Sequence, residues 1–297
     1  MESFQDAPEA LDLAPTIVRW FDASARSLPW RTDPTPWGVL VSEVMLQQTP
    51  VARVEPVWTD WLRRWPTPSA LAGDSPAAAI RAWGRLGYPR RALRLHAAAS
   101  AITAEHDGLV PTRYRELIAL PGIGDYTASA VVSFAFAGRA TVLDVNVRRL
   151  FARLLEGQPS TTPHVTAAER RLADALVPEH EPARWAAATM ELGQVVCTAR
   201  NPDCDRCPVA DRCAWLAAGK PGADQRTTKP QSFIGTDRQV RGLIVERLRA
   251  GGASRLQLDA LWTDVLQLAR ALDSLVADGL VDPVTSDTFA LPGDPPR

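Results

Sequence analysis

All four cysteines of the chain lie in one window, with the spacing Cys197-x6-Cys204-x2-Cys207-x5-Cys213. The N-terminus, MESFQDAPEALDL, is acidic where a secretory signal is basic, so we expect a cytoplasmic protein without disulfide bonds. Four thiolates suit either a zinc ion or an iron–sulfur cluster. All-cysteine zinc sites usually have two Cys-x2-Cys pairs, whereas this window has one pair and two outlying cysteines. Either group would fix this segment as a loop around a metal centre.

The rest of the sequence predicts an all-α protein. Strand-like alternation is almost absent before residue 280, and apolar residues recur at helical spacing through 62–65, 77–83, 92–102 and 114–120. A length of 297 residues and an apolar fraction of 46% fit two or three globular modules. No apolar run approaches the ~20 residues of a membrane span, so we expect no membrane partner.

A glycine-rich turn follows the predicted helix that ends near Leu120. Pro121, Gly122 and Gly124 force a tight turn, in which Ile123 is the only side chain large enough to anchor it. Glycines allow a nucleic-acid backbone to approach closely, and free N–H groups at the start of the next helix can bind a phosphate whatever the base. The same short pattern is also typical of an ordinary loop between helices.

Glu43 lies in a predicted helix, residues 37–48, with almost entirely apolar surroundings. The side chains three and four positions away are those of Val39, Leu40, Leu46 and Gln47. No basic side chain is therefore available for a helix ion pair, and we expect Glu43 to lie against or inside the core. Desolvation raises the pKa of a carboxyl group, which suits a general acid near neutral pH. An acid at the rim of an apolar face is the alternative.

Asp144 precedes a predicted helix over residues 145–155. It could be a simple N-cap of that helix. It could also be a carboxylate that stabilises positive charge in a reaction. The two roles are compatible, because N–H groups that bond the cap help to keep the carboxylate ionised.

Five motifs, which span residues 17–217 in the same order, resemble the MutY family of adenine DNA glycosylases. They are Leu28-Pro29-Trp30-Arg31, SEVMLQQT at residues 42–49, Trp83-x2-Leu86-Gly87-Tyr88, Leu120-Pro121-Gly122-x-Gly124 and Leu143-Asp144-x-Asn146-Val147. The resemblance implies a two-lobed helix-hairpin-helix fold that acts on double-stranded DNA. It also implies removal of adenine mispaired with guanine or 8-oxoguanine.

The same resemblance implies roles for individual residues. Glu43 would protonate the adenine, and Asp144, with Asn146 in its motif, would stabilise the positive sugar that forms as the N-glycosidic bond breaks. This agrees with the chemistry, because adenine leaves poorly until it is protonated and a cation-like sugar needs an ionised carboxylate nearby. Gln48 and Tyr88 would fill the base stack where the adenine flips out. The residues implied to line the adenine pocket are Arg26, Leu28, Trp30 and Arg31.

Tyr126 separates two branches of the helix-hairpin-helix glycosylases. Endonuclease III-like enzymes carry a lysine at this position, two residues beyond the second glycine, whose amine forms a Schiff base and leads to strand cleavage. Tyr126 cannot do so, and we predict a monofunctional enzyme in which water attacks the sugar. Thymine mismatch glycosylases resemble this chain at Tyr126 too, so selection of the base rests on Glu43.

The cysteine spacing resembles that of the 4Fe-4S site in the endonuclease III and MutY group, with Cys197, Cys204, Cys207 and Cys213 as ligands. The reaction needs no electron transfer, so we expect the cluster to fix the loop 198–203 and to let Arg200 bind a DNA phosphate. In the basic run 75–104, five arginines and no acidic residue suggest a cationic surface, although such runs are often only a solvated helix face.

Two positions depart from the family pattern. Pro50 stands where glutamine or arginine is common, yet Thr49-Pro50 fits an N-cap followed by a first-turn proline. Pro89 replaces the second aromatic residue of a Tyr-Tyr pair, and we expect it to affect only the wedge at Tyr88.

The C-terminal segment predicts a small winged-helix-like module after a polar linker over residues 218–235. Its helices are expected at 238–249, 255–261 and 266–277, and residues 280–284 and 288–291 are expected to pair as a hairpin. Residues 235–297 carry seven arginines against nine acidic residues, a net charge of −2, so packing or partner binding is as good an interpretation as DNA binding. About 60 residues are too few for the MutT-like domain that inspects 8-oxoguanine in many MutY relatives.

The predicted organisation is an iron–sulfur domain from residues 1–29 plus 141–217, a helical domain over 30–140, the linker and the module over 236–297. The predicted function is that of a monomeric adenine glycosylase of base-excision repair, associated with the nucleoid. A thymine or uracil mismatch glycosylase is the nearest alternative enzyme. A non-catalytic iron–sulfur DNA sensor is the alternative from another class, and the presence of both Glu43 and Asp144 argues against it.

Overall fold

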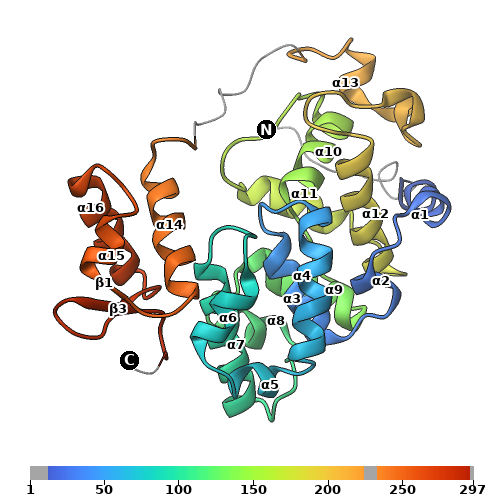
Figure 1. The fold of residues 1–297 in the computed structure, drawn as a ribbon. Helices are drawn as coiled ribbons and strands as arrows, with labels where there is room; N and C mark the ends of the chain where they lie inside the picture. The colour runs from blue at the N-terminus through green and yellow to red at the C-terminus, as the bar shows by residue number, and fades with distance from the viewer. Residues whose placement is uncertain (1–12, 224–232, 295–297) are drawn as a thin grey trace. The chain divides into compact units, whose positions relative to one another are not determined.

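The computed structural model describes residues 13–223 and 233–294, so residues 224–232 of the predicted linker lie outside it (Figure 1). The described residues form two compact units. The first contains residues 13–39, 112–114 and 124–223, and the second contains residues 40–111, 115–123 and 233–294. Helices dominate both units, which confirms the predicted all-α class. The predicted domain boundaries, which differ from these divisions, stay a prediction.

The first unit is built around three helices that bury a common apolar core. Helix α12 packs against α1 and α10, and the stacked rings of Phe151 and Trp185 lie 6.2 Å apart between α10 and α12. The elements of this unit are α1 (Leu13–Ser24), α2 (Pro29–Thr32), α9 (Asp125–Phe136), α10 (Val145–Glu156), α11 (Ala167–Ala175), α12 (Pro182–Val195), η2 (Cys204–Arg206), η3 (Ala210–Arg212) and α13 (Ala214–Ala217). Helices α3 (Pro36–Leu46) and α8 (Tyr114–Ala119) contain residues of both units.

The second unit begins with helices that the proline-rich turns start and stop. Thr67 and Ser75 cap α5 (Pro68–Ala72) and α6 (Pro76–Trp83) with their side chains, and each helix has proline in its first turn, where no N–H donor is lost. Between α4 (Val51–Arg64) and α6, the rings of Trp61 and Trp83 meet edge to face at 5.7 Å. Helix α7 (Arg90–Glu105) packs against α5 and α6.

The C-terminal module has the predicted order of three helices followed by a hairpin. The helices are α14 (Asp237–Arg249), α15 (Arg255–Asp259) and α16 (Val265–Ala277), and the strands are β1 (Ala253–Ser254), β2 (Asp282–Pro283) and β3 (Thr288–Ala290). The three strands form an antiparallel sheet in the order β1-β3-β2. Strand β1 is too short to give a sequence signal.

The module shares an apolar core with α6. Ala77 and Ile80 of α6 are fully buried in the same cluster as Val240, Ile244 and Leu268 of the module. The module is therefore packed into the second unit through apolar side chains, and this contact does not depend on a cationic surface.

Three of the five arginines in the basic run 75–104 are paired or buried, so they add little to the cationic surface that its composition suggested. Arg81 pairs with Asp294 at 2.5 Å, and Arg90 pairs with Asp278 at 2.9 Å. Arg91 is buried. Two carboxylates of the module therefore neutralise two arginines of the run.

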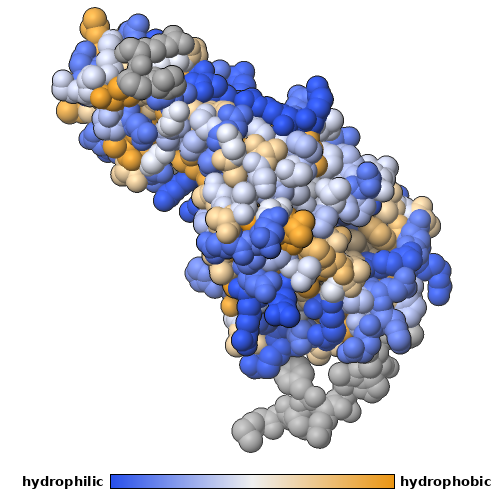
Figure 2. Space-filling model, turned by 90° about the horizontal axis from the view of Figure 1, so that it is seen from below, coloured by the Kyte–Doolittle hydropathy of each residue, from blue (hydrophilic) through white to orange (hydrophobic). Residues whose placement is uncertain are grey.

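No helix in the described ranges is long and apolar enough to span a membrane. On the face drawn in Figure 2, hydrophobic residues form small patches between hydrophilic ones.

Candidate functional site

Glu43 is buried in α3, with only 5% of its surface exposed. Leu40 and Met45 beside it are fully buried. The expectation that Glu43 lies in the core is confirmed. The helix ends at Leu46, two residues before its predicted end, because the chain turns sharply at Gln48.

Gln48 and Tyr88, the two predicted wedge residues, both have left-handed backbones. Their φ angles are 55° and 48°, and they are two of the six non-glycine residues with positive φ in the described part of the chain. Both side chains are exposed, Tyr88 by 44%. Such conformations cost about 1–3 kcal/mol and persist where the surroundings over-determine them, often at functional sites. Pro89 follows Tyr88 directly and occupies the N-cap of α7.

Arg91 holds the backbone around both wedge residues. Its guanidinium donates to the carbonyl oxygens of Val44, Met45 and Gln47 at the end of α3. It also donates to the carbonyl oxygen of Gly87, at 3.0 Å. Burial lowers the pKa of Arg91 to about 10. The sequence did not identify Arg91, because nothing distinguishes it there from its neighbours in the basic run.

The Thr49 hydroxyl accepts a hydrogen bond from Arg91 at 3.0 Å and does not cap α4. Pro50 occupies the N-cap position of that helix, so the expectation of a Thr49 cap with proline in the first turn was wrong by one residue. The Thr49 hydroxyl group therefore bonds the buried Arg91 guanidinium and not a backbone N–H group of α4.

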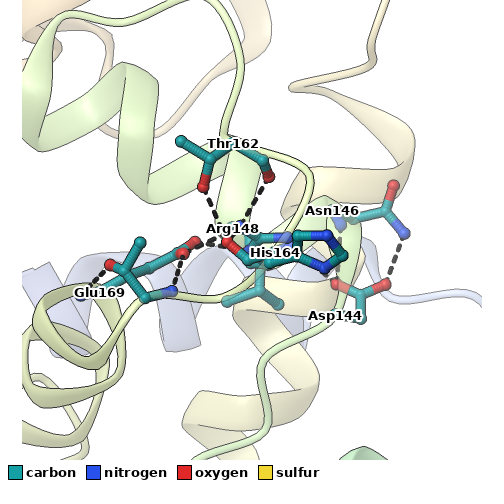
Figure 3. A network of polar contacts seen from close by, with 8 residues as sticks. Asp144, Asn146, Arg148, Thr162, His164 and Glu169 are labelled. Carbon is teal, nitrogen blue, oxygen red and sulfur yellow. Dashed lines mark hydrogen bonds and ion pairs between the residues drawn. The ribbon is translucent and has the colours of Figure 1, made fainter.

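Asp144 caps α10, as predicted. One carboxylate oxygen accepts from the backbone N–H groups of Asn146 at 2.9 Å and Val147 at 2.7 Å, and the other accepts from the Asn146 amide at 2.7 Å (Figure 3). Burial raises the pKa of Asp144 above its ordinary value, although these hydrogen bonds and the charge of Arg149 act in the opposite direction. The capping bonds therefore do not by themselves offset the desolvation of this carboxyl group.

Asn146 connects this cap to the cysteine loop. The Asn146 side-chain oxygen accepts from Arg149 at 3.0 Å, and Arg149 also donates to the carbonyl oxygen of Cys197 at 2.9 Å. Helix α12 comes so close here that a Cβ atom on Gly193 would lie 2.7 Å from the Asn146 carbonyl oxygen. One polar chain thus joins Asp144 to the first cysteine, and Arg149 was not identified from the sequence.

Arg148, on the same helix, fixes the loop that precedes α11. It pairs with Glu169 at 2.6 Å and donates to the carbonyl oxygens of Thr162 and His164 (Figure 3). These contacts hold the chain beside the start of α10, where Asp144 lies.

Arg26 and Arg31, predicted to line the adenine pocket, converge on a fully buried carboxylate that was not identified from the sequence. Glu191 of α12 accepts from Arg26 at 2.6 Å and from Arg31 at 3.0 Å. Burial alone would raise the pKa of Glu191, but the hydrogen bond from Arg26 and the charges of both arginines leave it lowered. Leu28 and Trp30, which lie between the two arginines in the sequence, are buried. Glu191 stands in an apolar helix without basic residues at i±3 or i±4, the same signal that marked Glu43.

The two glycines of the helix-hairpin-helix turn serve different purposes. Gly122 has a φ of 75°, and a Cβ atom there would lie 2.5 Å from Arg94, so the fold itself requires glycine. Gly124 has an ordinary φ of −99°, and a Cβ atom there would have no neighbouring atom within 4 Å. Ile123 is buried and anchors the turn, as expected. The open space at Gly124 leaves room for a close ligand at the start of α9.

Tyr126 lies on the first turn of α9 and packs against Ala130, Val142 and Ala186. Next to it, Asp125 accepts from Tyr114 and Arg170, both at 2.6 Å, which lowers its pKa against the effect of burial. The negative charge at the start of α9 is therefore balanced by an arginine.

The four cysteines line one cavity, which Arg153 and Trp215 also border. Arg153 donates to the sulfur of Cys197 at 3.4 Å and to the carbonyl oxygen of Thr198 at 2.7 Å. In the described ranges, no three His, Cys, Asp or Glu side chains converge as a single metal ion requires. Four thiols around one cavity beside a cation are suitable ligands for a metal centre. Arg200 is exposed in the loop before Cys204.

Two family matches agree with these observations. Residues 41–176 match the HhH-GPD superfamily of base excision DNA repair proteins, and residues 197–213 match the iron-sulfur binding domain of endonuclease III. The second match confirms the 4Fe-4S cofactor, for which the four cysteines are the proposed ligands.

Known proteins agree over longer stretches. The adenine DNA glycosylase of Mycobacterium tuberculosis (strain ATCC 25618 / H37Rv) is 48% identical over 283 residues, which cover 94% of this chain and 93% of the relative. A thermostable thymine-DNA glycosylase has a TM-score of 0.66 at 23% identity, covering 71% of this chain and 97% of its own. Endonuclease III in a trapped DNA complex has a TM-score of 0.61 at 23% identity. The match covers 74% of this chain and 99% of the endonuclease III chain. These two likenesses concern the fold alone. By its sequence likeness over nearly its whole length, the chain belongs to the family of adenine DNA glycosylases.

Proposed function

We propose that this protein hydrolyses the N-glycosidic bond of adenine in double-stranded DNA where the adenine is mispaired with guanine or 8-oxoguanine. Glu43 donates a proton to a ring nitrogen of the adenine, and Asp144 stabilises the positive sugar that forms as the bond breaks. The burial of Glu43 within an apolar helix supports this proposal most directly, because such surroundings favour the neutral, proton-bearing form of a carboxyl group.

The other predicted site residues have supporting roles. Arg26, Leu28, Trp30 and Arg31 line the adenine pocket, and Glu191 fixes both arginines. Gln48 and Tyr88 fill the stack that the adenine leaves, which suits their exposed side chains and constrained backbones. Asn146 orients the Asp144 carboxylate through its 2.7 Å hydrogen bond.

Contacts to the DNA backbone are proposed at two places. Gly122, Ile123 and Gly124 present the start of α9 to a phosphate, and the open space at Gly124 supports this. Arg200 contacts a second phosphate from the loop that the cluster fixes. When bound, the cluster supplies a rigid frame for that loop.

Tyr126 stands where a lysine would form a Schiff base, so the reaction is monofunctional and water completes the hydrolysis. We propose that the enzyme acts as a monomer on nucleoid DNA.

The proposal is tested by the release of free base from a set of duplexes under single-turnover conditions. The set carries adenine opposite 8-oxoguanine, guanine or thymine, and thymine or uracil opposite guanine. We expect free adenine from the first two duplexes, with an alkali-labile but unbroken strand. Release of thymine or uracil in place of adenine would move the function to a mismatch glycosylase of the other type, and release of no base would favour a binding protein.

A further inference from the structure

Arg238 of the C-terminal module lies over the ring of Tyr88, a predicted wedge residue. The guanidinium carbon of Arg238, in the first turn of α14, lies 4.5 Å from the centre of the Tyr88 ring. Arg91 of α7 lies 5.7 Å from the same ring centre. Two guanidinium groups from segments far apart in the sequence therefore lie over one exposed tyrosine.

The module reaches Tyr88 as a packed body. Its apolar core is shared with Ala77 and Ile80 of α6. Arg249 of α14 donates to the carbonyl oxygen of Gly84, at 2.6 Å, in the same turn region that leads to Tyr88. Arg81 and Arg90 add ion pairs to Asp294 and Asp278. The module thus contacts residues that precede Tyr88 in the sequence, Arg81 and Gly84, and one that follows it, Arg90.

Arg238 can lie over the Tyr88 ring because the carboxylate next to it, that of Asp237, is bonded to other residues. The adjacent carboxylate, Asp237, is bonded by Arg270 at 2.9 Å and by Gln267 at 3.0 Å. In residues 13–223 and 233–294, Arg238 forms no ion pair, and its guanidinium lies over the rings of Tyr88 and Phe233. Phe233, 53% exposed, lies 5.9 Å from the guanidinium at the entrance to α14.

A guanidinium over a tyrosine ring is attracted by the negative face of the ring, and the attraction grows when water is excluded. Tyr88 is 44% exposed, and the guanidinium groups of Arg91 and Arg238 lie against its ring. In the protein without DNA, the contact with Arg238 holds the Tyr88 ring at the place from which it would enter the base stack, before bases cover its faces.

We propose that Arg238 is a positioning residue for Tyr88, through which the C-terminal module promotes extrusion of the adenine. This inference rests on the proposed function of Tyr88 as the wedge. It gives the module a role in the reaction that does not require it to read the opposite base or to carry a positive net charge.

The test is a double-mutant cycle between Arg238→Ala and Tyr88→Ala in the full chain with its cluster. Single-turnover adenine release is measured on a duplex with adenine opposite 8-oxoguanine, and extrusion is followed by the fluorescence of 2-aminopurine placed next to the adenine. Loss of one cation–π contact predicts a rate roughly threefold to tenfold lower for Arg238→Ala, with a weaker fluorescence rise. In the Tyr88→Ala background, Arg238→Ala should have no further effect.

Two control variants separate positioning from folding. Arg238→Lys keeps a cation over the ring and should retain most of the rate. Arg255→Ala removes a module arginine that pairs with Asp259 in its own helix, and should leave both rate and fluorescence unchanged. Thermal unfolding of each variant identifies any loss that comes from a damaged module.

Three outcomes would overturn the inference. An unchanged rate for Arg238→Ala would remove any role for this residue. An equal loss in both Tyr88 backgrounds, with a salt dependence of DNA binding reduced by about one charge, would assign Arg238 to a DNA phosphate. A Tyr88→Ala variant as fast as the wild type would show that Tyr88 is not the wedge. The part of the proposed function on which this inference rests would then be wrong.

Discussion

Glu43 and Asp144 are both buried carboxyl groups, yet the chain surrounds them in opposite ways. Glu43 lies within α3, beside the fully buried side chains of Leu40 and Met45. Asp144 lies before the first turn of α10, where two backbone N–H groups and one amide point at it. The comparison shows two environments for a buried carboxyl group. Apolar side chains surround Glu43 within a helix, whereas capping hydrogen bonds reach Asp144 before a helix and only partly counter the effect of burial on its pKa.

The largest expected effect is that of Glu43→Gln. Because glutamine cannot donate a proton to the leaving base, we expect single-turnover adenine release to fall by roughly 10²–10⁴-fold, the usual contribution of a general acid. Binding to the mismatched duplex should be kept, which a gel-shift titration checks. Glu55→Gln, on the exposed face of α4, is the matched control and should keep the wild-type rate.

Asp144→Asn should have the next largest effect. Asparagine still caps a helix, so the fold is kept while the negative charge is lost, and we expect the rate to fall by roughly 10²–10³-fold. Asp264→Asn changes an equivalent cap, that of α16, which accepts from Gln267 at 3.0 Å. Equal rates for the Asp144 and Asp264 variants would mean that Asp144 is a cap and nothing more.

Glu191 extends the comparison to a third buried carboxylate, one that is paired with two arginines. Glu191→Gln leaves Arg26 and Arg31 without their anion, and we expect the free energy of unfolding to fall by about 1–3 kcal/mol. Urea unfolding measures this. The exposed pair of Glu181 and Arg184 supplies the control, since Glu181→Gln should cost less than about 1 kcal/mol.

The pH dependence is the smallest effect and tests the environment of Asp144 directly. Its pKa is raised by burial, and catalysis needs its ionised form, so the rate should fall on acidification at a higher pH than an ordinary aspartate would give. Stability should respond with the opposite sign. A folded-state pKa above the unfolded value makes this group's contribution to stability grow as the pH falls through the folded pKa. The Asp144→Asn variant should not show this decline in rate on acidification. If the decline persists in the variant, it belongs to another titrating group.

The sequence predicted those features that depend on local pattern. Asp144 before an amphipathic helix predicted a cap, apolar neighbours predicted the burial of Glu43, and the helical periodicity predicted the fold class. In each case the cause lies within one turn of the residue itself.

Features that depend on long-range contacts were not predicted. Arg90 and Arg91 are adjacent in the sequence, yet Arg91 is buried and donates to the end of α3, whereas Arg90 pairs with Asp278 of the module, 188 residues later. Thr49 was expected to cap α4, and the hydrogen bond from Arg91 takes its hydroxyl. Glu191 could have been found, because it shows the same apolar pattern as Glu43.

The central claim is that one carboxyl group supplies a proton and the other supplies negative charge, and a change of leaving group tests it most directly. Single-turnover release is measured for the wild type, Glu43→Gln and Asp144→Asn, with adenine and with a purine whose electron-withdrawing substituent lets it leave unprotonated. We predict that this purine restores Glu43→Gln towards the wild-type rate and leaves Asp144→Asn slow, because the sugar still becomes positive. Equal restoration of both variants, or of neither, would contradict the division of roles.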